Sequence, residues 1–317
     1  MRFDAWMAGL IVLYLGVFAG LWVSSGGTPE TAIIRGFGSL AFLMLSFTLS
    51  IGPLSRFSPR FKRLIFNRRH LGVTTFFVGL IHAVFSLLIY FEGDLFGVFT
   101  TNGAYGQAHR FPFVPFGLLS LLILLAMATT SHDWWFAKLG VRFWKRLHML
   151  VYLAYTSLAL HVGFGVLQDQ AWGWRIGFLA VVAAVFSLHL LAAYRERKID
   201  RTPSLREDGF RFACLKSEIP ENQAKAVTIG EERVAVIHYQ GEIYALTNVC
   251  PHQNGPLGEG KVVNGYLECP WHGFQFSPDQ GKGPPPYCDK VDRYEVRVDG
   301  DQVFVQPFPI EAQADEE

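Results

Sequence analysis

Residues 144–161 read WKRLHMLVYLAYTSLALH, and this stretch decides the fold of the first part of the chain. A basic turn precedes an apolar run that carries His148 at its start and His161 at its end. Because an apolar helix of about 17–25 residues crosses a bilayer, the stretch predicts a membrane span with two histidines. A histidine inside a membrane is costly, so both histidines are candidate functional residues.

Five more apolar stretches of similar length lie before residue 196, and with this one they predict six transmembrane helices. The six expected spans are residues 5–23, 33–51, 71–91, 113–129, 148–167 and 172–194. Of the 317 residues 50% are hydrophobic and only 17% are charged, which excludes a wholly soluble protein. The first span is not expected to be a signal peptide, because its flank is weakly positive and no small-residue cleavage site follows.

The loops between these spans differ in charge. Fourteen Lys and Arg residues follow the second, fourth and sixth spans, whereas the alternate loops carry only Arg35, Arg110 and Arg175. The positive-inside rule then places both chain ends in the cytoplasm of a bacterial inner membrane, with lipid around the spans. Residues 201–317 hold 11 Lys and Arg against 19 Asp and Glu, and the whole chain has a net charge of +1. The chain lacks the basic surplus of a nucleic-acid-binding protein.

Histidines of the third and fifth spans match in depth. Both spans run outward, so His82 lies about 18 Å beyond His70, and His161 lies about 20 Å beyond His148. Imidazoles that face each other across helices are a known kind of axial haem ligand. The matching depths of these histidines therefore predict one or two b-type haems. The outer haem pairs His82 with His161, and the inner haem pairs His148 with His70 as a candidate. His189 in the sixth span competes with His70 for that place.

Two difficulties attend this pairing. The 13-residue step from His148 to His161 turns about 140° away from the starting face of an ideal helix, so one face does not present both to the same neighbour. A membrane histidine can also simply form a hydrogen bond to a neighbouring helix. For His189 this second interpretation is favoured, and for His70 the two are evenly balanced.

Two local patterns resemble the ferric-reductase-like transmembrane family. Residues 68–72 (RRHLG), followed by His82 and Tyr90, are similar to its third span, and residues 144–153, followed by His161, are similar to its fifth. The resemblance covers roughly residues 30–195, and it implies that His82, His148 and His161 are haem ligands. The position of His70 generally holds a non-ligand in relatives. Within the family, the MsrQ-type haem subunits of bacterial methionine sulfoxide reductase systems are similar, which implies electron delivery to a periplasmic reductase.

The pattern changes after the sixth span. Residues 196–208 are charged and are expected to form a linker, and residues 311–317 an acidic tail. Between them, residues rich in Val, Ile, Tyr and Phe alternate with a period of two, which predicts short strands. These strands are expected at residues 233–239, 242–246, 294–298 and 302–305. The expected fold is therefore an all-α six-helix membrane bundle over residues 1–195 and a small all-β domain over residues 209–310.

The β domain carries the most informative motif of the chain. Cys250-Pro251-His252 is followed by Cys269-Pro270-Trp271-His272, a C-x-H and C-x-x-H pair. The pair closely resembles a Rieske [2Fe–2S] site, in which two thiolates hold one iron and two imidazoles hold the other. The resemblance implies that the cluster and metal ligands are Cys250, His252, Cys269 and His272.

Zinc is the alternative metal for these four residues. Zinc motifs usually space their thiolates as C-x2–4-C, and a C-x-H pair departs from that spacing. Leu257 and Trp271 stand where the high-potential Rieske branch has an extra disulfide, which implies the ferredoxin-like branch. Cys214 and Cys288 fall outside the motif and are expected to be small buried residues.

These features predict a membrane electron-transfer protein, an oxidoreductase component without catalytic residues of its own. Electrons would pass, in either direction, between a cytoplasmic Rieske cluster, the b-type haems and a quinone or periplasmic oxidoreductase. The chain has no G-x-G-x-x-G motif and no P-loop, so a separate cytoplasmic reductase or flavoprotein is the expected partner on that side. The alternatives are a transmembrane ferric reductase and a redox sensor without turnover.

Overall fold

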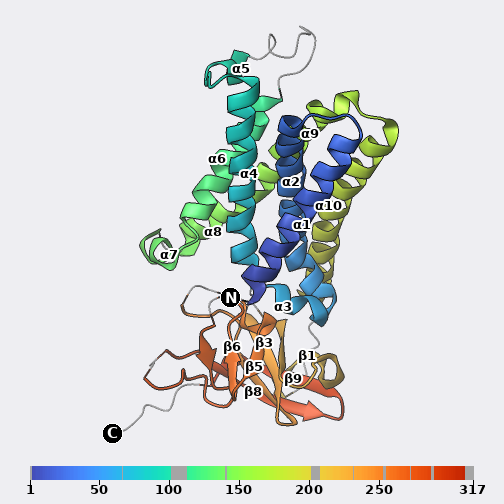
Figure 1. Cartoon of the computed structure of the whole chain (residues 1–317). Helices are drawn as coiled ribbons and strands as arrows, with labels where there is room; N and C mark the ends of the chain where they lie inside the picture. The colour runs from blue at the N-terminus through green and yellow to red at the C-terminus, as the bar shows by residue number, and fades with distance from the viewer. Residues whose placement is uncertain are drawn as a thin grey trace. The chain divides into compact units, whose positions relative to one another are not determined.

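The computed structural model describes residues 2–65, 67–100, 113–139, 141–200, 208–230, 232–252, 255–271, 273–286 and 289–310. Within it the chain divides into two compact units. One comprises Met1–Pro53 and Asn67–His189, and the other comprises Leu54–Phe66 and Leu190–Glu317. The first unit is helical, and the second contains the β-sheet (Figure 1).

Within the described residues, seven helices of nine or more residues carry the membrane part, and shorter helices connect them. The longer ones are α1 (Arg2–Ser24), α2 (Pro29–Phe57), α4 (Arg68–Tyr90), α6 (Val114–Thr129), α8 (Val141–Met149), α9 (Val151–Phe164) and α10 (Trp172–Asp200). The connecting helices are α3 (Lys62–Ile65), α5 (Gly97–Thr100) and α7 (Asp133–Leu139), with 3-10 turns at Pro59–Phe61 and Val166–Asp169.

Five helical segments of the described chain are long and apolar enough to cross a membrane, judged by length and composition. They are Phe3–Ser24, Pro29–Phe57, Arg68–Tyr90, Phe143–Phe164 and Trp172–Arg195. The remaining expected span corresponds to α6, which has 16 residues and is about 24 Å long. A typical hydrocarbon core is about 30 Å thick, so α6 is short for a membrane span, and it matches the predicted residues 113–129 to within one residue.

The interior of the bundle is a cluster of large apolar side chains from five helices. Leu45 of α2, Phe76 of α4, Ile123 of α6, Tyr155 of α9 and Val185 of α10 are all buried in it. The outer surface is apolar as well, and Trp6 of α1, for example, is 76% exposed. Helices that are apolar all round are typical of a membrane environment, so the helical part forms a multi-pass membrane protein.

The last helix ends later than the sequence predicted. The expected span stopped at residue 194, whereas α10 continues to Asp200. The first residues of the expected linker are therefore helical, because the charged run Arg195–Asp200 contains no Pro or Gly that would end a helix. Residues 201–207 of that linker, like the acidic tail 311–317, lie outside the described residues.

The all-β prediction for residues 209–310 is confirmed. Nine strands in the described residues form one antiparallel sheet in the order β1-β9-β8-β4-β3-β2-β5-β6-β7. They are β1 (Arg211–Leu215), β2 (Gln223–Ile229), β3 (Glu232–Tyr239), β4 (Glu242–Thr247), β5 (Lys261–Val263), β6 (Tyr266–Glu268), β7 (Gln275–Phe276), β8 (Arg293–Asp299) and β9 (Gln302–Pro309). The four strands expected from period-two alternation correspond to β3, β4, β8 and β9.

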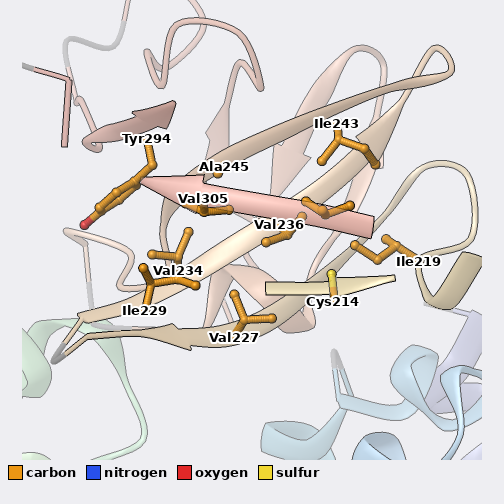
Figure 2. Close-up of a cluster of buried hydrophobic side chains, with 11 residues drawn as sticks. Cys214, Ile219, Val227, Ile229, Val234, Val236, Ile243, Ala245, Tyr294 and Val305 are labelled. Atoms are coloured by element: carbon orange, nitrogen blue, oxygen red, sulfur yellow. The ribbon is translucent and has the colours of Figure 1, made fainter. Parts of the chain in front are cut away.

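Two buried clusters stabilise this sheet. One of them, shown in Figure 2, joins Cys214, Val227, Val234 and Val305 with the ring of Tyr294. The other contains both motif cysteines, Cys250 and Cys269, together with Leu246, Leu257 and Phe276. The loops that carry the Cys and His motif are therefore fixed on a packed core.

Candidate redox sites

The structure brings together the two histidines predicted for the outer level. The ring centroids of His82 on α4 and His161 on α9 are 6.1 Å apart, and the ring planes cross at 77°. The Nδ1 atom of His82 lies 2.9 Å from the carbonyl oxygen of Ile34, and that of His161 lies 3.0 Å from the carbonyl oxygen of Phe113. A carbonyl only accepts, so each Nδ1 carries the hydrogen and each Nε2 keeps a lone pair for a metal.

Two glycines of neighbouring helices lie close to these rings. A Cβ atom on Gly38 of α2 would lie 2.9 Å from Nδ1 of His82. A Cβ atom on Gly117 of α6 would lie 2.6 Å from Nδ1 of His161. Both separations are too short for any other residue without displacement of the ring, so the glycines and the carbonyl acceptors together fix both imidazoles.

The spacing of this pair fits a metal held between the two rings. Two metal–nitrogen bonds of about 2 Å each, with about 1 Å from each ring centre to its nitrogen, separate the centroids by about 6 Å. The observed separation is 6.1 Å. The pair therefore has the donor atoms, the tautomers and the distance that a haem iron with two imidazole ligands requires.

His148 has the features of a third metal ligand. Its Nδ1 atom lies 3.1 Å from the carbonyl oxygen of Trp144, and its ring stacks on the Trp144 indole at 3.7 Å and 24°. Its Nε2 atom is buried and makes no hydrogen bond within the described chain. A buried nitrogen lone pair without a donor is costly unless a bound group uses it. Leu150, between α8 and α9, has a right-handed helical backbone conformation (φ −63°, ψ −10°), and α8 and α9 together form the single apolar segment Phe143–Phe164.

The structure pairs His70 with Asp4 of α1. His70 lies in the first turn of α4, where its Nδ1 atom is 2.9 Å from Oδ1 of Asp4, and its side chain is 58% exposed. His189 on α10 is half-buried, and its Nδ1 atom lies 2.9 Å from the carbonyl oxygen of Val185. Its ring meets the ring of Tyr152 edge-on at 5.2 Å.

In the β domain each motif cysteine begins a tight loop. Cys250 and Cys269 are each 1% exposed. The N–H of Cys250 donates to the carbonyl of Gly255 at 3.0 Å, and the N–H of Cys269 donates to the carbonyl of Phe274 at 2.7 Å. Gly273 has a φ of +72°, which glycine adopts without strain, so this residue lets the second loop turn back. Each hydrogen bond holds its cysteine at the base of a closed loop.

The two loops touch at the cysteine of the second. A Cβ atom on Gly255 would lie 2.5 Å from Sγ of Cys269 and 3.2 Å from the Trp271 ring. The ring of His252 stacks on Phe274 of the other loop at 3.8 Å and 13°. Three of the four predicted cluster ligands are thus held on loops in direct contact, and the fourth, His272, lies outside the described residues.

These loops can hold a two-iron cluster. Over the part of the chain that the structure describes, no three His, Cys, Asp or Glu side chains converge on one point as ligands of a single ion. A Rieske cluster does not require such a group, because each of its irons takes only two protein ligands. Buried thiolates on one side and an imidazole fixed by stacking on the other suit that chemistry.

Asn248 is a site residue that the motif did not reveal. Its side chain is 4% exposed, and Oδ1 accepts the N–H of Gly258 at 2.7 Å. Its backbone carbonyl also accepts the N–H of Leu257 at 2.8 Å, so one residue closes the loop that carries Cys250 and His252. The sequence offered one indication of this role, because Asn248 is a polar residue two positions before the first motif cysteine, at the end of an apolar strand.

Cys214 takes no part in this site. It is buried in the core of Figure 2, and burial raises the pKa of its thiol to about 12, so the thiol stays protonated and unreactive. This agrees with the expected role of a small buried residue. Cys288 lies outside the described residues.

Comparison with known proteins confirms both resemblances drawn from the sequence. Residues 35–159 match the family described as the ferric reductase like transmembrane component, and residues 210–295 match the Rieske [2Fe-2S] domain. The chain is 29% identical over 211 residues to the protein-methionine-sulfoxide reductase heme-binding subunit MsrQ of Brucella ovis and of Brucella melitensis, which covers 66% of this chain and 89% of the relative. Among solved structures, the ferredoxin of carbazole 1,9a-dioxygenase from Nocardioides aromaticivorans is 24% identical with a TM-score of 0.29, over 34% of this chain and 99% of that one.

Proposed function

We propose that this chain, in which a ferric-reductase-like transmembrane region is joined to a Rieske [2Fe–2S] domain, relays electrons between a cytoplasmic cluster, b-type haems in the membrane and a quinone or a periplasmic redox partner. One observation carries the proposal. The same chain holds the facing imidazoles of His82 and His161 and the buried motif cysteines Cys250 and Cys269. Two redox sites in one membrane protein are most simply explained as parts of one electron path.

The residues of the chain would have distinct tasks. His82 and His161 would hold the outer haem, His148 the inner haem, and Cys250, His252, Cys269 and His272 the cluster. When bound, these groups supply one-electron redox chemistry. The carbonyl acceptors at Nδ1 make the imidazoles better ligands and fix their orientation, and Gly38 and Gly117 leave room for the two rings. A fixed ligand set changes little in geometry between redox states.

The partners follow from the two ends of this path. The name of the Brucella relatives assigns them to a methionine sulfoxide reductase, and we propose a periplasmic oxidoreductase of that kind, or a quinone, as the partner at the outer haem. A cytoplasmic reductase or flavoprotein would exchange electrons with the cluster. The alignment with the Brucella relatives covers 66% of this chain. The partner of the Rieske domain is therefore inferred from the chemistry of the cluster.

Electron transfer from the cluster to a haem is the test of this function. Full-length protein in vesicles, with reductant confined to the side of the Rieske domain, should first show reduction of the cluster and then of the haem. The Cys269→Ser variant should keep its haem oxidised over the same interval, because the thiolate that holds the cluster is missing. Stopped-flow absorbance measures the haem, and electron paramagnetic resonance measures the cluster in samples frozen at matched times.

Cys214→Ser is the matched control, since it removes a buried cysteine outside the motif, and it should behave as the wild type. Equal rates of haem reduction in the Cys269→Ser variant and the wild type would refute the relay. Such a result would leave the cluster as a sensor without turnover. Rapid reoxidation of the haem by ferric ion alone would instead favour a metal reductase.

The orientation gives a second prediction. Fourteen Lys and Arg residues follow the second, fourth and sixth expected spans, so both termini should lie in the cytoplasm of a bacterial inner membrane. A phosphatase reporter that is active only in the periplasm should be silent when fused after Glu317. The same reporter inserted after Gly93, in an expected outer loop, should be active. The reverse pattern would mean that the Rieske domain faces outward.

A further inference from the structure

His189 lies on the face of α10 that packs against the first half of α9. Val185, one turn before it, is buried in the same cluster as Val151 and Tyr155. The His189 ring itself contacts the ring of Tyr152 at 5.2 Å. Tyr152 follows His148 by four residues, which is about one helical turn or 6 Å along the axis. The depth of His189 in the bundle is therefore within about one turn of that of His148.

The imidazole of His189 is held in the same way as those of the other candidate ligands. Its Nδ1 atom lies 2.9 Å from the carbonyl of Val185, four residues earlier on the same helix. The Nδ1 atom of His148 lies 3.1 Å from the carbonyl of Trp144, also four residues earlier. In both residues the hydrogen is fixed on Nδ1, so Nε2 is the atom that can bind a metal.

His70 lies on a different face of its helix. Phe77 and Ile81 lie on the same face of α4 as His70, about two and three turns later. They are 55% and 37% exposed. The buried face of α4 contains Leu71, Thr75 and Val78. His82 follows Val78 by four residues, so it lies on the same face. His70 is therefore turned away from the interior, and its Nδ1 atom pairs with Asp4.

We propose that His189, rather than His70, is the second axial ligand beside His148 at the inner haem. The proposal rests on the proposed function, because it requires that the membrane part binds two haems. The outer haem would then lie between α4 and α9, whereas the inner haem would lie between the α8–α9 segment and α10. The two haems would thus use different helix pairs, which removes the need for one helix to present two histidines to the same neighbour.

Haem content and spin state of single variants test the assignment in the full-length protein. We expect two low-spin haems in the wild type by the pyridine haemochrome assay and electron paramagnetic resonance. The His189→Ala variant should lose one haem or convert it to the high-spin form, and added imidazole should restore a low-spin signal. The cluster signal and the outer haem signal should be unchanged. The His70→Ala variant, the matched control, should keep both low-spin haems.

Two low-spin haems in the His189→Ala variant, or loss of the inner haem in the His70→Ala variant, would overturn the assignment. If His189→Ala also disturbs the outer haem, His189→Met decides, because Met can still bind iron. A low-spin inner haem with a shifted reduction potential would then support the proposal, and loss of both haems would overturn it. A single haem in the wild type, unaffected by His148→Ala, would refute the two-haem premise itself.

Discussion

Replacement of His161 with alanine is expected to remove the outer haem and to leave the other redox groups in place. The ring of His161 faces that of His82 at 6.1 Å, and Gly117 and the carbonyl of Phe113 hold it there. Without this ring one axial position of the iron has no protein ligand, so the haem should be lost or become high-spin. The cluster ligands belong to the separate β unit and should be unaffected.

The measurement combines haem stoichiometry with cluster content on the same sample, followed by electron transfer to an acceptor on the outer side. We expect one haem fewer per chain, unchanged cluster content and no transfer to the outer acceptor. His132→Ala is the matched control, because His132 is an exposed histidine whose Nδ1 accepts the N–H of Trp134 at 3.2 Å. Full haem content together with full electron flow in the His161→Ala variant would contradict the ligand assignment.

A graded variant separates the loss of a ligand from its misplacement. Gly117→Ala keeps His161 but adds a Cβ atom that would lie 2.6 Å from its Nδ1. Loss of an orienting contact around a metal ligand typically lowers metal affinity by about 10–100-fold, so haem should bind more weakly. Gly72→Ala, where a Cβ atom meets nothing within 4 Å, should bind haem as the wild type does.

Depth along the helices predicted, without any structure, that the rings of His82 and His161 lie close together. It succeeded because the rise per residue of a membrane helix is nearly constant, so residues at equal distance from the membrane surface lie at one level. Depth does not specify which side of a helix a residue occupies. His70 has the depth expected of an inner ligand, but it lies on the face of α4 that continues to the exposed Phe77. Burial periodicity would have indicated that face, since Phe77 follows His70 by seven residues.

The groups that fix the imidazoles were not predictable from the sequence. The carbonyls of Ile34 and Phe113 each lie 48 residues from the histidine that they orient, and every residue type except proline has the same backbone groups. Gly38 and Gly117 lie in apolar spans, where glycine is common for other reasons. Their importance appears only when the opposing helix is in place.

In the β domain the motif identified candidate ligands, whereas period-two alternation identified β3, β4, β8 and β9 but missed β1 and the seven-residue β2. Strands β5, β6 and β7 have three, three and two residues, which is too few to show a period. They are nevertheless important, because β6 leads directly into Cys269 and β7 follows the loop that this cysteine begins. The local chemistry of the site was therefore clearer in the sequence than the elements that support it.

A single added methyl group at Gly255 is expected to remove the cluster. The Cβ atom of Gly255→Ala would lie 2.5 Å from Sγ of Cys269, and the Trp271 ring at 3.2 Å closes the other side. The Cys269 sulfur cannot move away without leaving the position of a cluster ligand, and its N–H is bound to the carbonyl of Phe274 at 2.7 Å. Overpacking of this kind typically costs about 1–3 kcal/mol, which here opposes both folding of the loop and cluster binding. We expect the purified full-length variant to lack the cluster absorbance and the signal of the reduced cluster, with its haem content unchanged.

Gly241→Ala separates this steric effect from the general cost of replacing a glycine. Gly241 has a φ of +78° in the turn between β3 and β4, and a Cβ atom there meets nothing within 4 Å. The substitution strains the backbone by about 1–3 kcal/mol but touches no ligand, so the domain should melt at a lower temperature and still contain the full cluster. Gly255 carries no positive φ, so its replacement acts through the contacts of the added Cβ with Cys269 and Trp271. If Gly255→Ala keeps its cluster with an unchanged reduction potential, the two loops do not approach each other as closely as the ligand geometry proposed here requires.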